Sequence, residues 1–189
     1  YSMWGKLSLR EGRRRADRLE RSLNDNGLRV LRNEVFTLAG NNGGKPLAIV
    51  GLDDEWTGHL DAPRAFNGID PDQPTICLNH NPANERDLLD YPWQWMLAGH
   101  THGRAIATTR VGRFLYPKRF RHFTHGSYAV EGRHLYVNRG LSYGQRARHW
   151  CRPEITLFTL EPTSPDAPAN ANIEHITLKP ANPPLGEGR

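Results

Sequence analysis

The sequence predicts an α/β fold, and three observations support this. Residues 75–79 (TICLN) and 95–99 (WMLAG) are short apolar runs, which suit strands buried on both faces of a sheet. The residues between them, 83–91 (ANERDLLDY), can form about two turns of helix. A strand–helix–strand unit of this kind is typical of an α/β domain. With 189 residues, of which 37% are hydrophobic, the chain is long enough for one domain or for part of a larger one.

The first element along the chain is an amphipathic helix predicted at residues 9–24. Residues 8–11 (SLRE) form a capping box, apolar side chains recur on one helical face up to Leu23, and Gly27 supplies a stop. The arginines of this segment are interpreted as a solvated face, with a ligand-binding surface as the alternative.

Strands and turns dominate the rest of the chain. Further strands are predicted at residues 28–31, 34–39, 47–52 and 154–160. A turn at 40–45 (GNNGGK) joins two of them, because Gly and Asn adopt positive φ at little cost. Residues 127–140 alternate around Glu131-Gly132-Arg133 and therefore predict a β-hairpin.

The C-terminal segment differs in composition from the part before it. From residue 161 onward the chain is rich in Pro, Ala and Asn, and only residues 173–178 (IEHITL) suit an added edge strand. We therefore expect one domain at residues 1–160, followed by a mostly flexible tail at 161–189.

The charge balance favours an anionic partner. The net charge is +5 and the pI about 9.5, which suits phosphoesters, acidic lipid head groups or nucleic acid. Cys77 and Cys151 lack CxxC spacing, so we interpret them as small buried hydrophobic residues rather than a zinc site or a disulfide. No window of about 18 consecutive apolar residues is present, so no membrane span is predicted.

Three histidines lie where two predicted central strands end. His80 follows the first strand, and His100 and His102 follow the second. Because ligands of open α/β sheets bind outside the carboxyl ends of the strands, we expect these side chains to converge. In an extended segment alternate side chains leave on the same side, so His100 and His102 are expected to face one pocket, each toward its own ion. Any one of them alone would favour a structural role, but the joint pattern favours metal binding.

Several segments together resemble a known family. GLDDEW, LNHNP, LAGHTHG, LYVNRGLS and RPEITLFTL are similar to the C-terminal half of a calcineurin-like metallophosphoesterase. The branch is that of the bacterial phosphodiesterases that include UDP-2,3-diacylglucosamine hydrolase-type and YaeI/YkuE-like proteins. The resemblance covers roughly residues 1–160. It implies the C-terminal half of an α/β/β/α sandwich with mixed sheets.

The resemblance also implies a site with two divalent metal ions. His80 and His100 would bind one ion and His102 the other, and Mn, Fe, Zn and Co are all candidates. The family's Asp-x-His, Gly-Asp and Gly-Asn-His-Asp motifs do not occur in the chain, and its opening YSMWG resembles the segment that follows the last of them. The remaining ligands and the catalytic acid are therefore expected upstream of Tyr1, and residues 1–189 alone are expected to bind metal weakly and to be inactive.

The expected function of the intact protein is hydrolysis of a phosphoester, a phosphodiester or a pyrophosphate, by a metal-bridged hydroxide. The alternative is a non-catalytic basic module, or a degenerate relative, that binds nucleic acid or anionic lipid. The expected partner is a phosphoester substrate, with a nucleotide-linked lipid as one option, no stable nucleic-acid partner, and contact with a membrane surface left open. The expected location is the cytoplasm or the periphery of the inner membrane.

Four further residues are candidates near this site. Arg104 follows GHTHG, where family members usually continue Gly-Gln, and its guanidinium either forks onto a substrate phosphate or points to solvent. Arg139 belongs to a recurrent family turn, for which a role in folding is favoured and phosphate contact is the alternative. Asp53 and Asp54 end a predicted strand, where a loop-capping role is favoured over one beside the metals.

Overall fold

The computed structural model describes residues 9–40, 45–104, 122–141, 153–160 and 173–177. The strands are β1 (Glu34–Leu38), β2 (Leu47–Gly51), β3 (Thr75–Leu78), β4 (Trp95–Ala98), β5 (Gly126–Val130), β6 (Arg133–Val137), β7 (Glu154–Phe158) and β8 (Ile173–Thr177). The helical segments are α1 (Leu9–Asp25), α2 (Ala62–Ala65) and the 3₁₀ turns η1 (Glu55–Thr57), η2 (Pro82–Leu88) and η3 (His102–Arg104).

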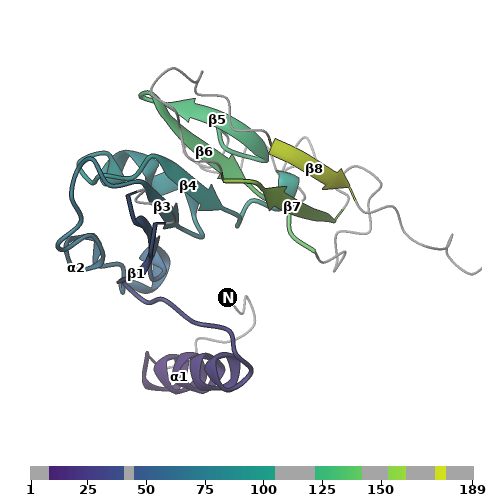
Figure 1. Cartoon of the computed structure of the whole chain (residues 1–189). Helices are drawn as coiled ribbons and strands as arrows, with labels where there is room; N and C mark the ends of the chain where they lie inside the picture. Colours follow the sequence, from purple (N-terminus) through teal and green to yellow (C-terminus); the bar gives the residue numbers. More distant parts are fainter. Residues whose placement is uncertain (1–8, 41–44, 105–121, 142–152, 161–172, 178–189) are drawn as a thin grey trace, which may run out of the picture.

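A mixed sheet forms the centre of the molecule (Figure 1). Its order is β1-β2-β3-β4-β6-β5, while β7 and β8 form a separate antiparallel pair. The inner strands β2, β3, β4 and β6 are parallel to one another, and the outer strands β1 and β5 run antiparallel to their neighbours. The predicted α/β fold with mixed sheets is therefore confirmed. The carboxyl ends of all four parallel strands lie at the same edge of the sheet.

The core lies on one face of this sheet. The strands supply alternate buried side chains, among them Val50, Cys77, Met96 and Leu135, and these pack with residues of α2 and η2. Cys77 is fully buried, which raises the pKa of its thiol and confirms the prediction of an inert buried cysteine. Cys151 lies outside the described residues.

Among the described residues, β7 covers part of the opposite face of the sheet. Trp95 and Tyr136 are on this face, and the ring of Phe158 in β7 packs edge-on against both of them, with ring centroids 6.1 Å and 5.1 Å away. The small sheet thus covers the end of the large sheet that carries β4 and β6.

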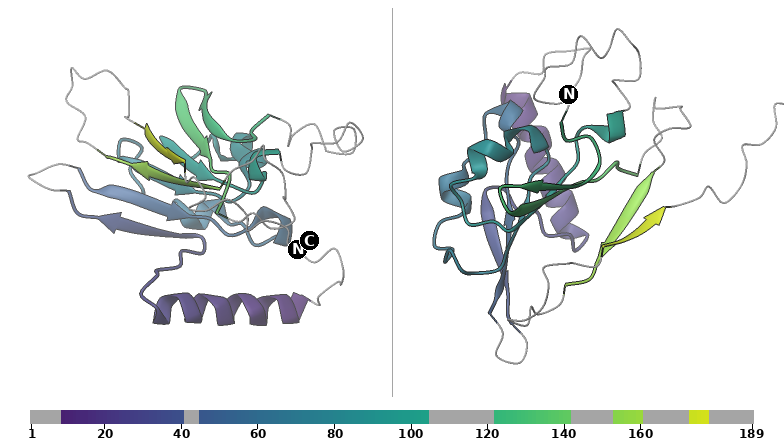
Figure 2. Two further views of the ribbon diagram at one scale, coloured as in Figure 1. Left: turned by 90° about the vertical axis from the view of Figure 1, so that its right-hand side faces the viewer. Right: turned by 90° about the horizontal axis from the view of Figure 1, so that it is seen from above.

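Helix α1 lies beside the sheet, on the side of β1 and β2 (Figures 1 and 2). It has the predicted extent, and its arginines from Arg13 to Arg21 are exposed as expected. Its apolar stripe is less buried than an amphipathic helix usually is, since Leu19 is 60% exposed and Leu23 half-buried. Among the described residues, no helix is both long and apolar enough to cross a bilayer.

One guanidinium joins α1 to the sheet. Arg32 forms ion pairs with Asp17 (3.2 Å) and Glu20 (3.0 Å) of α1 and with Asp53 (3.0 Å), which follows β2. A single side chain therefore links the helix to the loop at the carboxyl end of a parallel strand.

The strand predicted at 28–31 is absent. The chain leaves α1 here, and the N–H groups of Leu28 and Val30 donate to the carbonyl of Leu23 (2.9 Å) and to the side chain of Asn24 (3.2 Å). Because these donors complete the end of the helix, they are not used for pairing with a strand. The helix predicted at 83–91 is the 3₁₀ segment η2, and the other predicted strands and the hairpin are present within one to three residues. Ser8 of the capping box, most of the GNNGGK turn and most of 161–189 lie outside the described residues.

Gly51 at the end of β2 provides a test of this packing. A Cβ atom at Gly51 would lie 2.3 Å from the Cβ of Leu31 and 2.8 Å from its carbonyl oxygen. We expect Gly51→Ala to lower the free energy of unfolding by about 1–3 kcal/mol, as overpacking in a core does. Urea denaturation followed by circular dichroism measures this change.

Gly12 in α1 is the matched control, because nothing lies within 4 Å of a Cβ added there. Gly12→Ala is expected to raise stability by about 0.5–1 kcal/mol through helix propensity. Wild-type stability in Gly51→Ala would show that Leu31 does not pack on β2 in this way.

Candidate metal centre

The structure brings His80 and His100 together at the carboxyl edge of the parallel strands. Backbone pairing continues past β3 and β4, since the N–H of Asn79 donates to the carbonyl of Leu97 (3.0 Å) and that of Gly99 to the carbonyl of His80 (3.1 Å). The two imidazole rings are 5.3 Å apart between centroids and nearly perpendicular, at 81°. Two potential metal ligands that are distant in sequence are thus neighbours in space.

The backbone that carries His100 and His102 is not extended, so the expected strand-like alternation is wrong. Both residues have left-handed dihedral angles, with φ of 63° and 51°. Thr101 between them is buried, and its hydroxyl donates to the carbonyl of Thr124 (2.7 Å). The GHTHG segment is therefore a tight loop fixed by its threonine, and each histidine is directed by a left-handed turn.

His102 does not join the other two histidines in one cluster. Within the described ranges, no group of three or more His, Cys, Asp or Glu side chains is arranged to hold a metal ion. The resemblance divides the three histidines between two ions, and the assignment of His102 to the other ion stays a prediction.

The surroundings of His100 favour the neutral imidazole. Burial lowers its pKa, the nearby His80 lowers it further by charge repulsion, and Asp54 acts in the opposite direction. A neutral imidazole has the lone pair that a metal requires. The pair of imidazoles therefore fits a borderline divalent ion such as Zn, Mn, Fe or Co.

Two buried asparagines shape the loop that carries His80. The side-chain amide of Asn79 donates to the carbonyl of Asn81 (2.9 Å) and to the side chain of Asn84 (2.7 Å). Asn81 accepts from the N–H of Ala83 (3.1 Å) and so caps η2. Sequence reasoning missed these roles, although an asparagine before a proline is a readable helix-start signal.

A third loop, from β2 into η1, reaches the His80–His100 pair. Asp54 accepts from the N–H of Trp56 (3.3 Å), which confirms the predicted capping role for this aspartate. The indole of Trp56 contacts His100 edge-on, with ring centroids 4.7 Å apart and an interplanar angle of 77°. Sequence reasoning considered the aspartates of GLDDEW and missed the tryptophan, whose signal was a large aromatic in an otherwise polar strand-end loop.

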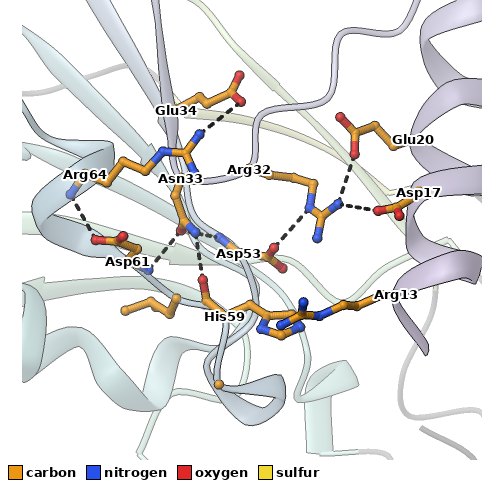
Figure 3. A pocket seen from close by; sticks show the side chains of 12 residues that line it. Arg13, Asp17, Glu20, Arg32, Asn33, Glu34, Asp53, His59, Asp61 and Arg64 are labelled. Atoms are coloured by element: carbon orange, nitrogen blue, oxygen red, sulfur yellow. Dashed lines mark hydrogen bonds and ion pairs between the residues drawn. The ribbon is translucent and has the colours of Figure 1, made fainter. Parts of the chain in front are cut away.

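The loop from Asp53 to Asp61 is closed by one buried amide (Figure 3). The side-chain oxygen of Asn33 accepts from the N–H groups of Asp53 (3.0 Å) and Asp61 (3.1 Å), and its nitrogen donates to the carbonyl of His59 (2.7 Å). Asn33 has a φ of 53°, which asparagine tolerates better than most residues. Both ends of the loop that holds Trp56 are therefore tied to the same side chain.

An open cavity of about 670 Å³ lies between α1 and this loop, and neither His80 nor His100 lines it (Figure 3). Its walls carry both signs of charge, and several of these charges pair, as Arg32 does with Glu20 and Arg64 with Glu34 (3.8 Å). We interpret it as the seam between helix and sheet rather than as a substrate pocket.

Arg139 takes part in a polar network behind the site. Its guanidinium pairs with Glu154, which is 3% exposed and also accepts from the hydroxyls of Tyr136 and Thr156. Asn138 before it donates its N–H to the carbonyl of Ala98 (2.8 Å), next to GHTHG. This network gives Arg139 the folding role that the sequence analysis favoured.

Contact with a substrate phosphate stays a prediction for Arg104 and for Arg139. The backbone of Arg104 lies in η3, directly after His102 and Gly103.

Sequence comparison with known proteins found several relatives. The chain is 34% identical over 141 residues to phosphodiesterase YaeI of Escherichia coli K12. These residues are 74% of this chain and 50% of the relative. It is 35% identical over 139 residues to the uncharacterized metallophosphoesterase YkuE of Bacillus subtilis, covering 73% and 48%. It is 34% identical over 142 residues to UDP-2,3-diacylglucosamine pyrophosphatase LpxG of Chlamydia trachomatis, covering 68% and 43%.

The chain thus spans about half the length of the curated relatives it matches. No family model matches it, and no solved structure does.

Glu154 yields a prediction on stability against pH. Burial alone would raise its pKa, but hydrogen bonds from Tyr136, Arg139 and Thr156 outweigh burial and hold the pKa below its usual 4.5. The ionised group therefore contributes stability that is complete above about pH 4.5 and is lost as the pH falls through the folded-state pKa. We expect Glu154→Gln to lower the free energy of unfolding at pH 7 by about 1–3 kcal/mol and to flatten its decline in acid.

Urea denaturation between pH 3 and 7 measures both effects, with the exposed Asp87→Asn as control. Equal acid sensitivity of wild type and Glu154→Gln would contradict the network.

Proposed function

Because the chain belongs to the metallophosphoesterase family, in the branch of these relatives, we propose that it supplies His80, His100 and His102 to the dinuclear metal centre of a phosphoester hydrolase. The observation that carries the proposal is the pairing of His80 with His100 at the carboxyl edge of the parallel strands. Ligand sites of open α/β sheets lie at this edge.

The chemistry that divalent ions supply at such centres is Lewis acidity toward phosphoryl oxygens and activation of water. The residues of this chain hold and orient the ligands. Burial lowers the pKa of the His100 imidazole and so favours its neutral form, and the buried Thr101 fixes the loop on which His100 stands.

A complete centre needs more ligands than these three imidazoles. Two would serve one ion and one the other, whereas a catalytic zinc-type ion takes about three protein ligands. Two cations ~3.5–4 Å apart also need a bridging carboxylate to screen their repulsion. We therefore propose that carboxylates outside residues 1–189 complete the site, in keeping with relatives of which this chain matches only about half the length.

The proposed substrate is a phosphodiester or a pyrophosphate. Two relatives support it by name, one a phosphodiesterase and the other a UDP-2,3-diacylglucosamine pyrophosphatase, so a nucleotide-linked lipid is included. Arg104 and Arg139 are the proposed phosphate contacts. Of the two, Arg104 is the favoured contact, because Arg139 is already paired with Glu154.

Metal binding by residues 1–189 alone tests the ligand count. We expect less than one tightly held equivalent of Zn²⁺ or Mn²⁺ per chain after dialysis, because three imidazoles divided between two ions bind each of them weakly. Elemental analysis of the dialysed protein measures this. About two tightly held equivalents, or robust phosphodiesterase turnover by this chain, would contradict the proposal.

Substitution of the histidines in the intact protein tests their role in catalysis. His80→Ala or His100→Ala is expected to abolish metal-dependent hydrolysis of bis(p-nitrophenyl) phosphate while leaving the circular dichroism spectrum near that of the wild type. The exposed His122→Ala serves as a control and should retain full activity. Undiminished hydrolysis in either histidine variant would remove it from the metal centre.

A further inference from the structure

We propose that the η1 turn braces the two histidine loops and that Trp56 is the positioning residue for the His100 imidazole. The inference rests on the proposed function, because it concerns how the His80–His100 pair is held for metal binding. It assigns a role to a side chain that is neither a ligand nor part of the core.

The first contact is between two rings. The indole of Trp56 meets the imidazole of His100 edge-on, at 4.7 Å and 77°, and His80 meets the same imidazole from another direction, at 5.3 Å and 81°. The left-handed backbone of His100 sets where its side chain starts, but leaves the rotation of the ring free. The two neighbouring rings restrict this rotation.

The second contact leads from the same turn to the other histidine loop. The carboxylate of Glu55 accepts from the side-chain amide of Asn81 (3.4 Å), the residue that follows His80. Glu55 and Trp56 are adjacent in η1, so one short turn touches both loops. Their relative position therefore depends on where η1 lies.

The turn itself is well fixed. Its start is capped by Asp54, the hydroxyl of Thr57 donates to the carbonyl of Asp54 (2.8 Å), and the left-handed Gly58 donates its N–H to Glu55 (2.9 Å). Asn33 ties both ends of the loop to one place, as described above. Trp56 thus projects from a rigid support rather than from a loosely held loop.

Burial does not explain the tryptophan. Trp56 is 44% exposed and is absent from the apolar core, so packing within the core does not account for its position. A large aromatic held outside the core, against a ring that is itself a candidate ligand, is better explained by support of that ligand. Neighbours that orient metal-bound histidines contribute substantially to metal affinity in other proteins.

The test is a titration of the intact protein with Co²⁺, whose visible absorption reports the coordination of the ion. Trp56→Ala is expected to weaken Co²⁺ binding by about tenfold and to change the absorption spectrum, because the His100 ring is no longer held. Trp56→Phe keeps an aromatic edge and is expected to restore most of the affinity. Leu38→Ala, with a similar exposure of 42% on β1, is the matched control and should leave both properties unchanged.

Two results would contradict the proposed positioning role of Trp56. One is wild-type Co²⁺ affinity and spectrum in Trp56→Ala. The other is a Trp56→Ala variant in which only the KM for bis(p-nitrophenyl) phosphate rises, since this marks contact with the substrate. Urea denaturation of both Trp56 variants verifies that each is folded.

His100→Ala in the same titration separates the inference from the function on which it rests. Unchanged Co²⁺ affinity in His100→Ala would remove the metal assignment itself. Weaker Co²⁺ binding in His100→Ala together with unchanged Co²⁺ binding in Trp56→Ala would contradict only the role of Trp56.

Discussion

The candidate metal centre depends on the parallel direction of four neighbouring strands. Because β2, β3, β4 and β6 run in the same direction, the loop after each strand leaves from the same edge of the sheet. Those loops carry Trp56, His80, GHTHG and Arg139. An antiparallel arrangement would send alternate loops to opposite edges and keep His80 away from His100. The parallel direction of these strands, more than any local motif, creates the site.

Buried polar side chains then give these loops their shape. Asn33 closes one loop, Asn79 organises the next and Thr101 anchors the third, each through hydrogen bonds to backbone groups. In the part of the chain that the structure describes, no buried side-chain nitrogen or oxygen lacks a partner. Buried groups of this kind cost little when paired and a great deal when a partner is removed. The rim of the sheet is therefore held by directional bonds, and the core below it by apolar packing.

Local patterns predicted what local forces determine. The apolar runs at 75–79 and 95–99 identified β3 and β4, and the hairpin at 127–140 identified β5 and β6, because burial and turn chemistry act over a few residues. The strand expected at 28–31 was wrong because its N–H groups complete the end of α1, a competition that an apolar run does not reveal. The contact of Trp56 with His100 was missed because it joins two strand ends through the tertiary fold.

The left-handed backbone at His100 and His102 affects how relatives of this chain diverge. Such a conformation is costly for most side chains and least so for glycine and asparagine. A descendant that no longer needed its metals could replace the histidines. Its backbone would keep the left-handed dihedral angles as long as Thr101 remained buried. Glycine and asparagine are then the acceptable replacements, whereas valine and isoleucine are not. Glycines and a central threonine in a distant sequence thus indicate that the loop has the same conformation. Only the histidines indicate that it binds metal.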